Sequence, residues 1–177
     1  MIPLGPWEPD RSPRLNDNLL SVADGAYPTP DGWRPCGAFV PVQSALPRAA
    51  KGGASFTSPK GVSSIIVGTD TTLYRANSGG WSAIGTNYSL QGEGRWRFAQ
   101  FGGLAIATNG VDPMQKIDLT TFATAALGGS PPRFTMLAVV KDFLVGGVYD
   151  GDVNTIGWSG LNDAEFWTTA QRQADKN

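Results

Sequence analysis

From residue 52 onward the chain repeats a pattern of short apolar segments, separated by Gly, Asn and Asp, at intervals of about 40 residues. Ile66, Ile106 and Val145 hold matching places in the second segment of each repeat, at spacings of 40 and 39 residues. Matching places in the third segment are held by Tyr74, Gln115 and Ile156. Four short strands in about 40 residues are typical of one blade of a β-propeller. The sequence therefore predicts about three blades, over 52–92, 93–130 and 131–170.

Three blades do not close a propeller, because known propellers have about four to eight blades. An unclosed propeller leaves strand edges exposed, and exposed edges recruit other strands. We therefore expect this chain either to be the front part of a longer polypeptide or to have its edges covered by other chains. The same meandering strands also occur in β-sandwiches, and that alternative remains open at this stage.

The composition agrees with an all-β fold. The chain contains 23 glycines and 13 prolines among its 177 residues, and these residue types mark turns between short strands. Hydrophobic residues make up 41% of the chain and charged residues only 16%, which is not the composition of a disordered protein. A chain of this length can bury a substantial core. We expect an all-β protein.

The composition also excludes several classes of function. The chain has no histidine and one cysteine, so histidine-based catalysis, an internal disulfide and cysteine metal clusters are all excluded within it. Its net charge of −1 provides no general attraction to nucleic acid or anionic lipid. No apolar run is long enough to span a membrane, and the N-terminus does not resemble a signal peptide. We expect no enzyme activity, no cofactor, no metal and no membrane anchor.

Several acidic residues are candidates for metal ligands or catalytic groups. The segment 150–154 begins like a calcium-binding loop, but Thr155 stands where that loop needs glycine and Leu161 where it needs glutamate. A hairpin turn is the favoured interpretation. The remaining candidate carboxylates lie at expected turns or strand ends, where aspartate bonds to the local backbone. They are Asp70, Asp112, Asp118, Asp142 and Asp163.

Residues 1–51 differ from the rest of the chain, because they contain nine of its 13 prolines. Proline removes a backbone donor, so this stretch is not expected to form central strands. We expect an extended arm with turns and one short helical turn near residues 18–20. The arm also carries bulky apolar side chains, which either pack back onto the same chain or form contacts with a neighbouring subunit. The candidate interface residues are Trp7, Leu15, Leu19, Leu20, Tyr27 and Trp33.

Basic and aromatic residues alternate in the run Arg95-Trp96-Arg97-Phe98. In a strand the two aromatic side chains share one face and the two arginines share the other. The plain interpretation is that the aromatic residues face the core and the arginines face solvent. A second hypothesis is that Arg95 and Arg97 face a channel that carries DNA, or an adjacent subunit.

Three stretches, in order, resemble one family of virion proteins. Residues 96–102 match W-R-F-A-Q-F-G, residues 107–115 contain N-G-x-D-x-x-Q, and residues 158–163 match W-S-G-L-N-D. The segments 5–10 and 27–47 are similar to the opening of the same family. The family is the tail-hub or nozzle protein of short-tailed bacteriophages, also called the packaged-DNA stabilisation or head-completion protein. The resemblance extends over about residues 5–172.

This resemblance implies a structural subunit of the virion, located in the phage tail. Such a subunit contains a β-propeller and assembles into a ring, a hexamer by resemblance, below the portal and adaptor proteins. Its expected partners are these proteins, other tail proteins and the packaged DNA, which the ring retains and conducts without sequence-specific binding. Members of the family are usually longer, with more blades, so this chain resembles their N-terminal portion.

The alternative function is that of a carbohydrate-binding or hydrolytic tail propeller that recognises a host receptor. A sugar site needs exposed aromatic residues beside a pair of carboxylates. The sequence shows no such cluster.

Overall fold

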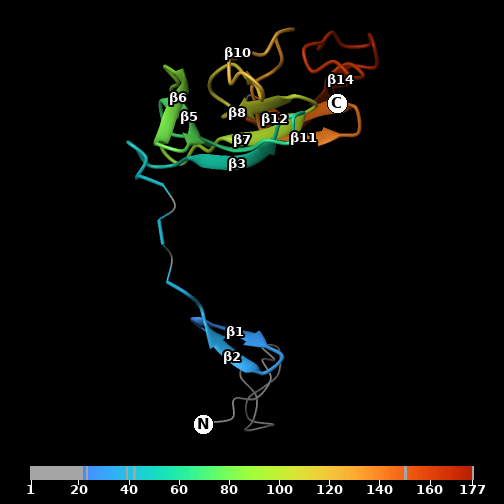
Figure 1. The fold of residues 1–177 in the computed structure, drawn as a ribbon. Coiled ribbons are helices and arrows are strands. Elements are labelled where there is room, and N and C mark those ends of the chain that lie inside the picture. Colours follow the sequence, from blue (N-terminus) through green and yellow to red (C-terminus); the bar gives the residue numbers. More distant parts are fainter. Residues whose placement is uncertain (1–21, 23, 39, 42, 150, 177) are drawn as a thin grey trace, which may run out of the picture. The chain divides into compact units, whose positions relative to one another are not determined.

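The computed structural model describes residues 22, 24–38, 40–41, 43–149 and 151–176 (Figure 1). Within these residues the chain forms fourteen β-strands and no helix, so the expectation of an all-β protein is confirmed. The chain divides into two compact units, residues 1–42 and residues 43–177, and each is described by itself.

The first unit contains one hairpin, formed by β1 (Ala26–Thr29) and β2 (Gly32–Pro35). The sequence predicted only an extended arm with turns, without these strands. Pro28 and Pro35 are tolerated because each strand of a two-stranded hairpin has a free edge that needs no backbone donor. Thr29 Oγ1 donates to the carbonyl of Gly32 at 2.9 Å and fastens the turn. The helical turn expected near residues 18–20 lies outside the described residues.

The second unit contains three four-stranded antiparallel sheets, in each of which every strand pairs with the next one along the chain. Sheet 1 consists of β3 (Gly52–Thr57), β4 (Ser63–Gly68), β5 (Thr72–Asn77) and β6 (Gly80–Thr86). Sheet 2 consists of β7 (Arg97–Phe101), β8 (Leu104–Thr108), β9 (Gln115–Asp118) and β10 (Thr124–Ala126). Sheet 3 consists of β11 (Phe134–Val140), β12 (Phe143–Tyr149), β13 (Asp152–Trp158) and β14 (Asp175–Lys176). The described residues thus form three consecutive four-stranded units but no closed ring of sheets.

The last strand of the third unit was placed wrongly. The repeat pattern predicted that this unit ends near Phe166 and Trp167, with no strand in the polar tail, whereas β14 lies at Asp175–Lys176. Trp167 instead packs against Phe134, with ring centroids 5.7 Å apart. Trp167 is therefore used in core packing from a loop, and a polar dipeptide completes the sheet.

One predicted register is also wrong by a single residue. Tyr74 and Gln115 each pair with the residue that follows the aligned isoleucine of the second strand. In sheet 3 the residue that follows the aligned Val145 is Gly146, and it pairs with Gly157, whereas Ile156 pairs with Gly147. Gly157 therefore holds the position equivalent to Tyr74 and Gln115. The β12–β13 hairpin contains a register shift and is longer than its counterparts. Ile156 consequently lies on the opposite face of its sheet from the face that the alignment implied.

Sheet 2 is buried on both faces. Ala105 and Ala107 belong to the core between sheets 1 and 2, called the first core, whereas Ile106 between them belongs to the core between sheets 2 and 3, called the second core. All three residues have no exposed surface. Because successive side chains of a strand point to opposite faces, an uninterrupted apolar run is needed in a strand covered on both sides. The first strands lie side by side, with β7 against both β3 and β11 (Figure 1).

The first core depends on a glycine under the indole of Trp96. A Cβ atom added at Gly68 would collide with the ring of Trp96. We expect Gly68→Ala to destabilise the protein by about 1–3 kcal/mol, because overpacking forces the ring or the backbone to shift. Urea unfolding followed by fluorescence measures the change. Gly79→Ala is the matched control, since its Cβ would meet only Asn77 Oδ1 at 3.6 Å. Equal stability of the two variants would contradict the packing described.

Candidate functional site

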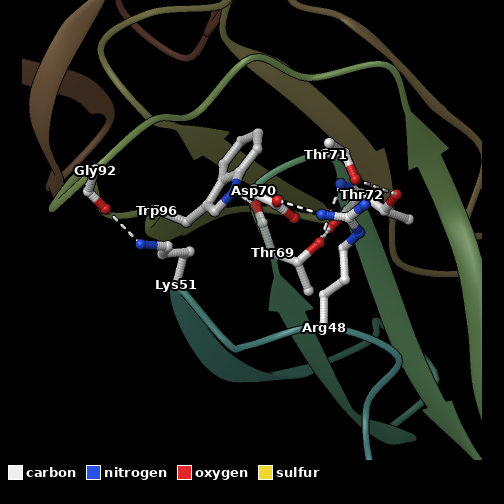
Figure 2. Close-up of polar contacts among 8 residues, drawn as sticks. All are labelled: Arg48, Lys51, Thr69, Asp70, Thr71, Thr72, Gly92 and Trp96. Carbon is white, nitrogen blue, oxygen red and sulfur yellow. Dashed lines mark hydrogen bonds and ion pairs between the residues drawn. The ribbon is translucent and has the colours of Figure 1, made fainter.

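The side chain of Trp96 joins sheet 1 to sheet 2 (Figure 2). Its exposed fraction is 2%, and its Nε1 donates to the carbonyl oxygen of Thr69 at 2.7 Å. Its backbone N–H donates to the carbonyl of Lys51 at 2.9 Å. The residue immediately before β7 is thus bonded both to the turn after β4 and to the residue before β3. This arrangement, here called the Trp96 junction, fixes where the first strand of sheet 2 begins.

The β4–β5 turn supplies a closed set of hydrogen bonds to this junction. Thr69 Oγ1 donates to the carbonyl of Thr72 at 3.0 Å and accepts from the backbone N–H of Thr72 at 3.2 Å. Both threonines are buried. A buried turn needs such bonds because its backbone groups have no access to water. The turn is therefore a rigid acceptor for the indole N–H.

Three charged side chains, those of Arg48, Lys51 and Asp70, lie near the Trp96 junction (Figure 2). Arg48 lies 2.6 Å from Asp70 Oδ2, and Lys51 Nζ donates to the carbonyl of Gly92. Both basic side chains come from the segment that precedes β3, and they hold the β4–β5 turn and the loop before β7. Exposed ion pairs contribute little to stability. Their effect is to position three segments that lie far apart in the sequence.

The arginines singled out from the sequence lie at this junction. Arg95 and Arg97 are both exposed, whereas Trp96 is buried and Phe98 packs against the first core. The predicted separation of aromatic and basic side chains onto opposite faces is therefore confirmed. Arg95 lies 3.8 Å from Glu93 in an exposed pair. The role of the two exposed guanidinium groups at a channel stays a prediction.

Of the candidate interface residues in the arm, Tyr27 and Trp33 are described, and they do not share a face. Tyr27 pairs with Arg34, and Trp33 pairs with Pro28, so Tyr27 and Trp33 lie on opposite faces of their hairpin. Tyr27 is 46% exposed and Trp33 is half-buried. The remaining candidates, Trp7, Leu15, Leu19 and Leu20, lie outside the described residues.

Sequence reasoning missed the side chain that links the first strands of sheets 1 and 2. Gln100 on β7 donates through Nε2 to the carbonyl of Thr57 at 2.8 Å and accepts through Oε1 from the Thr57 N–H at 3.3 Å. Its amide therefore pairs with the free edge of β3 as a backbone peptide would. No local sequence pattern predicts that a glutamine side chain bonds to the backbone of a strand 43 residues away.

Sequence reasoning also missed two basic residues that reach from one sheet to the next. Arg75 pairs with Ile66 and Lys116 pairs with Ile106, so they hold equivalent positions in sheets 1 and 2. The guanidinium of Arg75 lies 3.5 Å from the ring centroid of Phe122 in the β9–β10 loop. Lys116 Nζ lies 2.8 Å from Glu165 Oε1 in the segment after β13. Arg75 and Lys116 are 41 residues apart, about one repeat, so aligning the repeats could have identified them as equivalent residues.

Two titratable groups are perturbed by these inter-sheet contacts. The hydrogen bond from Lys116 and then that from the Gly128 N–H lower the pKa of Glu165 below its usual 4.5. Burial, with a smaller contribution from the charge of Asp112, raises the pKa of Tyr88 to about 12. Tyr88 packs edge-on to Trp96, with centroids 4.9 Å apart. Both shifts follow from packing between sheets.

Some of the carboxylates named from the sequence bond to their own turns, whereas Asp70 pairs with Arg48 and Asp112 accepts from the Ser89 N–H. Asp118 accepts from the backbone N–H groups of Thr120 and Thr121, and these bonds lower its pKa. Asp152 in the β12–β13 hairpin accepts from the Thr155 hydroxyl and the Asn154 N–H, which likewise lowers its pKa. In the described part of the chain, no three His, Cys, Asp or Glu residues are grouped as metal ligands would be.

The described residues contain no helix long and apolar enough to cross a bilayer.

No protein-family model matches the chain, and no curated protein matches it either. The resemblance to phage nozzle proteins therefore depends on the three motifs and on the segments 5–10 and 27–47. Two of the motifs have a structural role here. The motif W-R-F-A-Q-F-G contains Trp96 and Gln100, which link sheets 1 and 2. The motif N-G-x-D-x-x-Q contains Gln115, whose Oε1 lies 3.3 Å from the Tyr88 hydroxyl.

The bond from Trp96 to Thr69 gives a testable prediction. Trp96→Phe removes the indole donor and leaves the buried carbonyl of Thr69 unpaired, which costs about 1–3 kcal/mol in addition to the lost ring contacts. Trp158→Phe is the control, because its Nε1 donates to Gln173 at an exposed site, where about 0.5 kcal/mol or less is expected. Thermal unfolding of both variants measures the difference. Equal losses would show that the Trp96 junction adds no stability.

The pair between Glu165 and Lys116 makes stability depend on pH. The folded pKa of Glu165 is lowered, so the carboxylate stabilises the fold above its unfolded pKa. That contribution is lost as the pH falls through the folded pKa. We expect Glu165→Gln to be less stable than the natural chain at about pH 7 and to approach it at about pH 3. Urea unfolding at both values is the measurement, and a constant difference would contradict the assignment.

Proposed function

We propose that this chain is a structural subunit of a bacteriophage tail, in the nozzle or hub ring, and that it acts through assembly. The observation that carries the proposal is the unequal burial of the three sheets. Sheet 2 is covered on both faces by its neighbours, whereas sheets 1 and 3 are each packed on one face by the described sheets. A chain built in this way is completed by other β-sheets.

The arrangement supports an open β-propeller of three blades. Each sheet is a four-stranded meander, and the first strands of the sheets are neighbours, as the innermost strands of propeller blades are. A β-sandwich would instead contain two facing layers. Sheet 2 lies between two further sheets, which favours blades arranged side by side around an axis.

In this proposal Arg95 and Arg97 face the DNA channel or the adjacent subunit. Arg97 is the first residue of β7, one of the first strands, and Arg95 lies two residues before it; both are exposed. A channel that holds DNA and then releases it benefits from few cationic contacts, because each phosphate contact strengthens binding. A net charge of −1 with two arginines near the first strand is consistent with retention of DNA without tight binding.

The arm forms the contacts with neighbouring subunits, the portal or the adaptor in this proposal. Trp7, Leu15, Leu19, Leu20, Tyr27 and Trp33 are the proposed anchors. Aromatic and bulky apolar side chains of this kind dominate the energetics of protein interfaces. The ring is hexameric by family resemblance.

Deletion of residues 1–42 tests the role of the arm. The three sheets and both cores are formed by residues 43–177, so we expect an unchanged melting temperature for the sheets. We also expect the shortened chain to fail to enter phage particles. Differential scanning calorimetry and an incorporation assay measure the two outcomes. A much lower melting temperature together with normal incorporation would contradict the interface role.

Replacing both arginines tests the channel. We expect Arg95→Gln combined with Arg97→Gln to assemble normally but to retain packaged DNA less well, because two phosphate-binding charges are lost. The measurement is DNA release from purified particles, with Lys60→Gln as an exposed control. Unchanged retention would contradict a channel position. Strong binding of the natural chain to host surface polysaccharide would instead support a receptor-binding propeller.

A further inference from the structure

Residues 43–50, here called the strap, lie along sheet 1 before the chain enters β3. The side-chain amide of Gln43 donates to the carbonyl of Asn77 at 2.8 Å. The indole Nε1 of Trp81 donates to the carbonyl of Ser44, also at 2.8 Å. Asn77 is the last residue of β5, and Trp81 lies on β6. The first residues of the strap are therefore bonded to the β5–β6 hairpin.

The other end of the strap is bonded at the opposite end of β5. Arg48 pairs at 2.6 Å with Asp70, which lies in the turn before β5 (Figure 2). Lys51, which follows the strap, joins the sheet, since its backbone N–H donates to the carbonyl of Gly68 at 2.7 Å. Because Asp70 and Asn77 flank the two ends of β5, the strap extends along the length of this strand.

The strap is bonded to the face of sheet 1 that points away from sheet 2, here called the outer face. Ile66 belongs to the first core, so its neighbour Val67 points to the outer face, and Tyr74 pairs with Val67. Trp81 shares this face, because it pairs with the residue two places after Tyr74. The carbonyl of Ser44 in the strap thus accepts from a side chain of the outer face.

The repeat shows how far the outer face is covered. The equivalent face of sheet 2 packs against sheet 1, and its residues Ala105 and Ala107 have no exposed surface. Their equivalents in sheet 1 are Ile65 and Val67. Ile65 is 47% exposed, whereas Val67 is only 8% exposed although sheet 2 packs on the opposite face. Val67 is the one that adjoins the end of the strap, next to the bond between Lys51 and Gly68, so the strap covers one part of this face.

We propose that the strap is a detachable cover of the outer face, which opens while the three sheets remain folded. Two of its attachments are single hydrogen bonds between a side chain and a carbonyl, and each contributes little to stability. The third is an ion pair whose side chains are 57% and 33% exposed, so water screens it. Among the described residues, neither core includes a residue of the strap. Segments with few buried contacts open at a lower free energy than the core.

Opening of the strap changes what sheet 1 presents to other molecules. Val67, Tyr74 and Trp81 become accessible and, together with Ile65, form one uncharged face. A contiguous exposed apolar patch is an interaction surface. The strap therefore controls whether sheet 1 can associate through its outer face. The proposal goes beyond the tail function and does not depend on it.

Thiol labelling of single-cysteine variants measures the opening. The natural Cys36 is exposed and is replaced by serine in every variant. Val67→Cys places a thiol under the strap, and Ala107→Cys places one at the equivalent position of sheet 2, under sheet 1. We expect the Val67→Cys thiol to react at least about tenfold faster under native conditions, because the strap opens alone whereas the first core opens only on unfolding. Circular dichroism verifies that the variants fold.

Removing one strap bond distinguishes opening of the strap from simple accessibility of position 67. Gln43→Ala and, separately, Trp81→Phe should speed the labelling of Val67→Cys by roughly threefold to tenfold, because one hydrogen bond that holds the strap is lost. The labelling of Ala107→Cys should stay the same. Gln91→Ala is the matched control, at an exposed glutamine outside the strap. Unchanged labelling of Val67→Cys in both variants, or an equal increase at Ala107→Cys, would overturn the proposal.

Discussion

The position of sheet 2 depends on one buried side chain. Trp96 fills the space above Gly68, donates its indole N–H to the carbonyl of Thr69 and lies edge-on to Tyr88. A large aromatic residue with one polar atom is suited to such a place, because it contributes extensive apolar contact and one directional bond. It thereby sets both the distance between sheets 1 and 2 and the starting point of β7. The second core follows from that placement, since β7 and β8 contribute residues to both cores.

Much of the fold could be predicted because its signals are local. Short apolar runs end at Gly, Asn or Asp, and their spacing of about 40 residues repeats, so the four-stranded units were predictable from the sequence. The last strand was not predictable, because Asp175 and Lys176 form a two-residue strand with no apolar pattern. Phe166 and Trp167 appeared to be a strand because an aromatic pair in a loop cannot be distinguished from one in a strand by periodicity alone.

The candidate site was predictable only in part. The alternation in residues 95–98 was enough to assign the two aromatic residues to the core and the two arginines to the surface. The contact between Lys116 and Glu165 joins residues 49 apart, and the bonds of Gln100 to Thr57 join residues 43 apart. Such contacts depend on which sheets are neighbours, and a single sequence does not contain that information locally. The β1–β2 hairpin was missed because the rule that excludes proline applies to central strands and not to edges.

The amide of Gln100 affects whether the free edge of β3 can pair with a strand of another molecule. The free edge of β3 has backbone donors and acceptors, and an extended segment from another molecule would bind there by continuing the ladder. Gln100 occupies one donor and one acceptor of that edge, both on Thr57. An incoming strand would have to displace the side chain before it formed its first pair of bonds at this residue. The glutamine therefore opposes aggregation through the edge of β3, and it leaves the faces of the sheets free to associate.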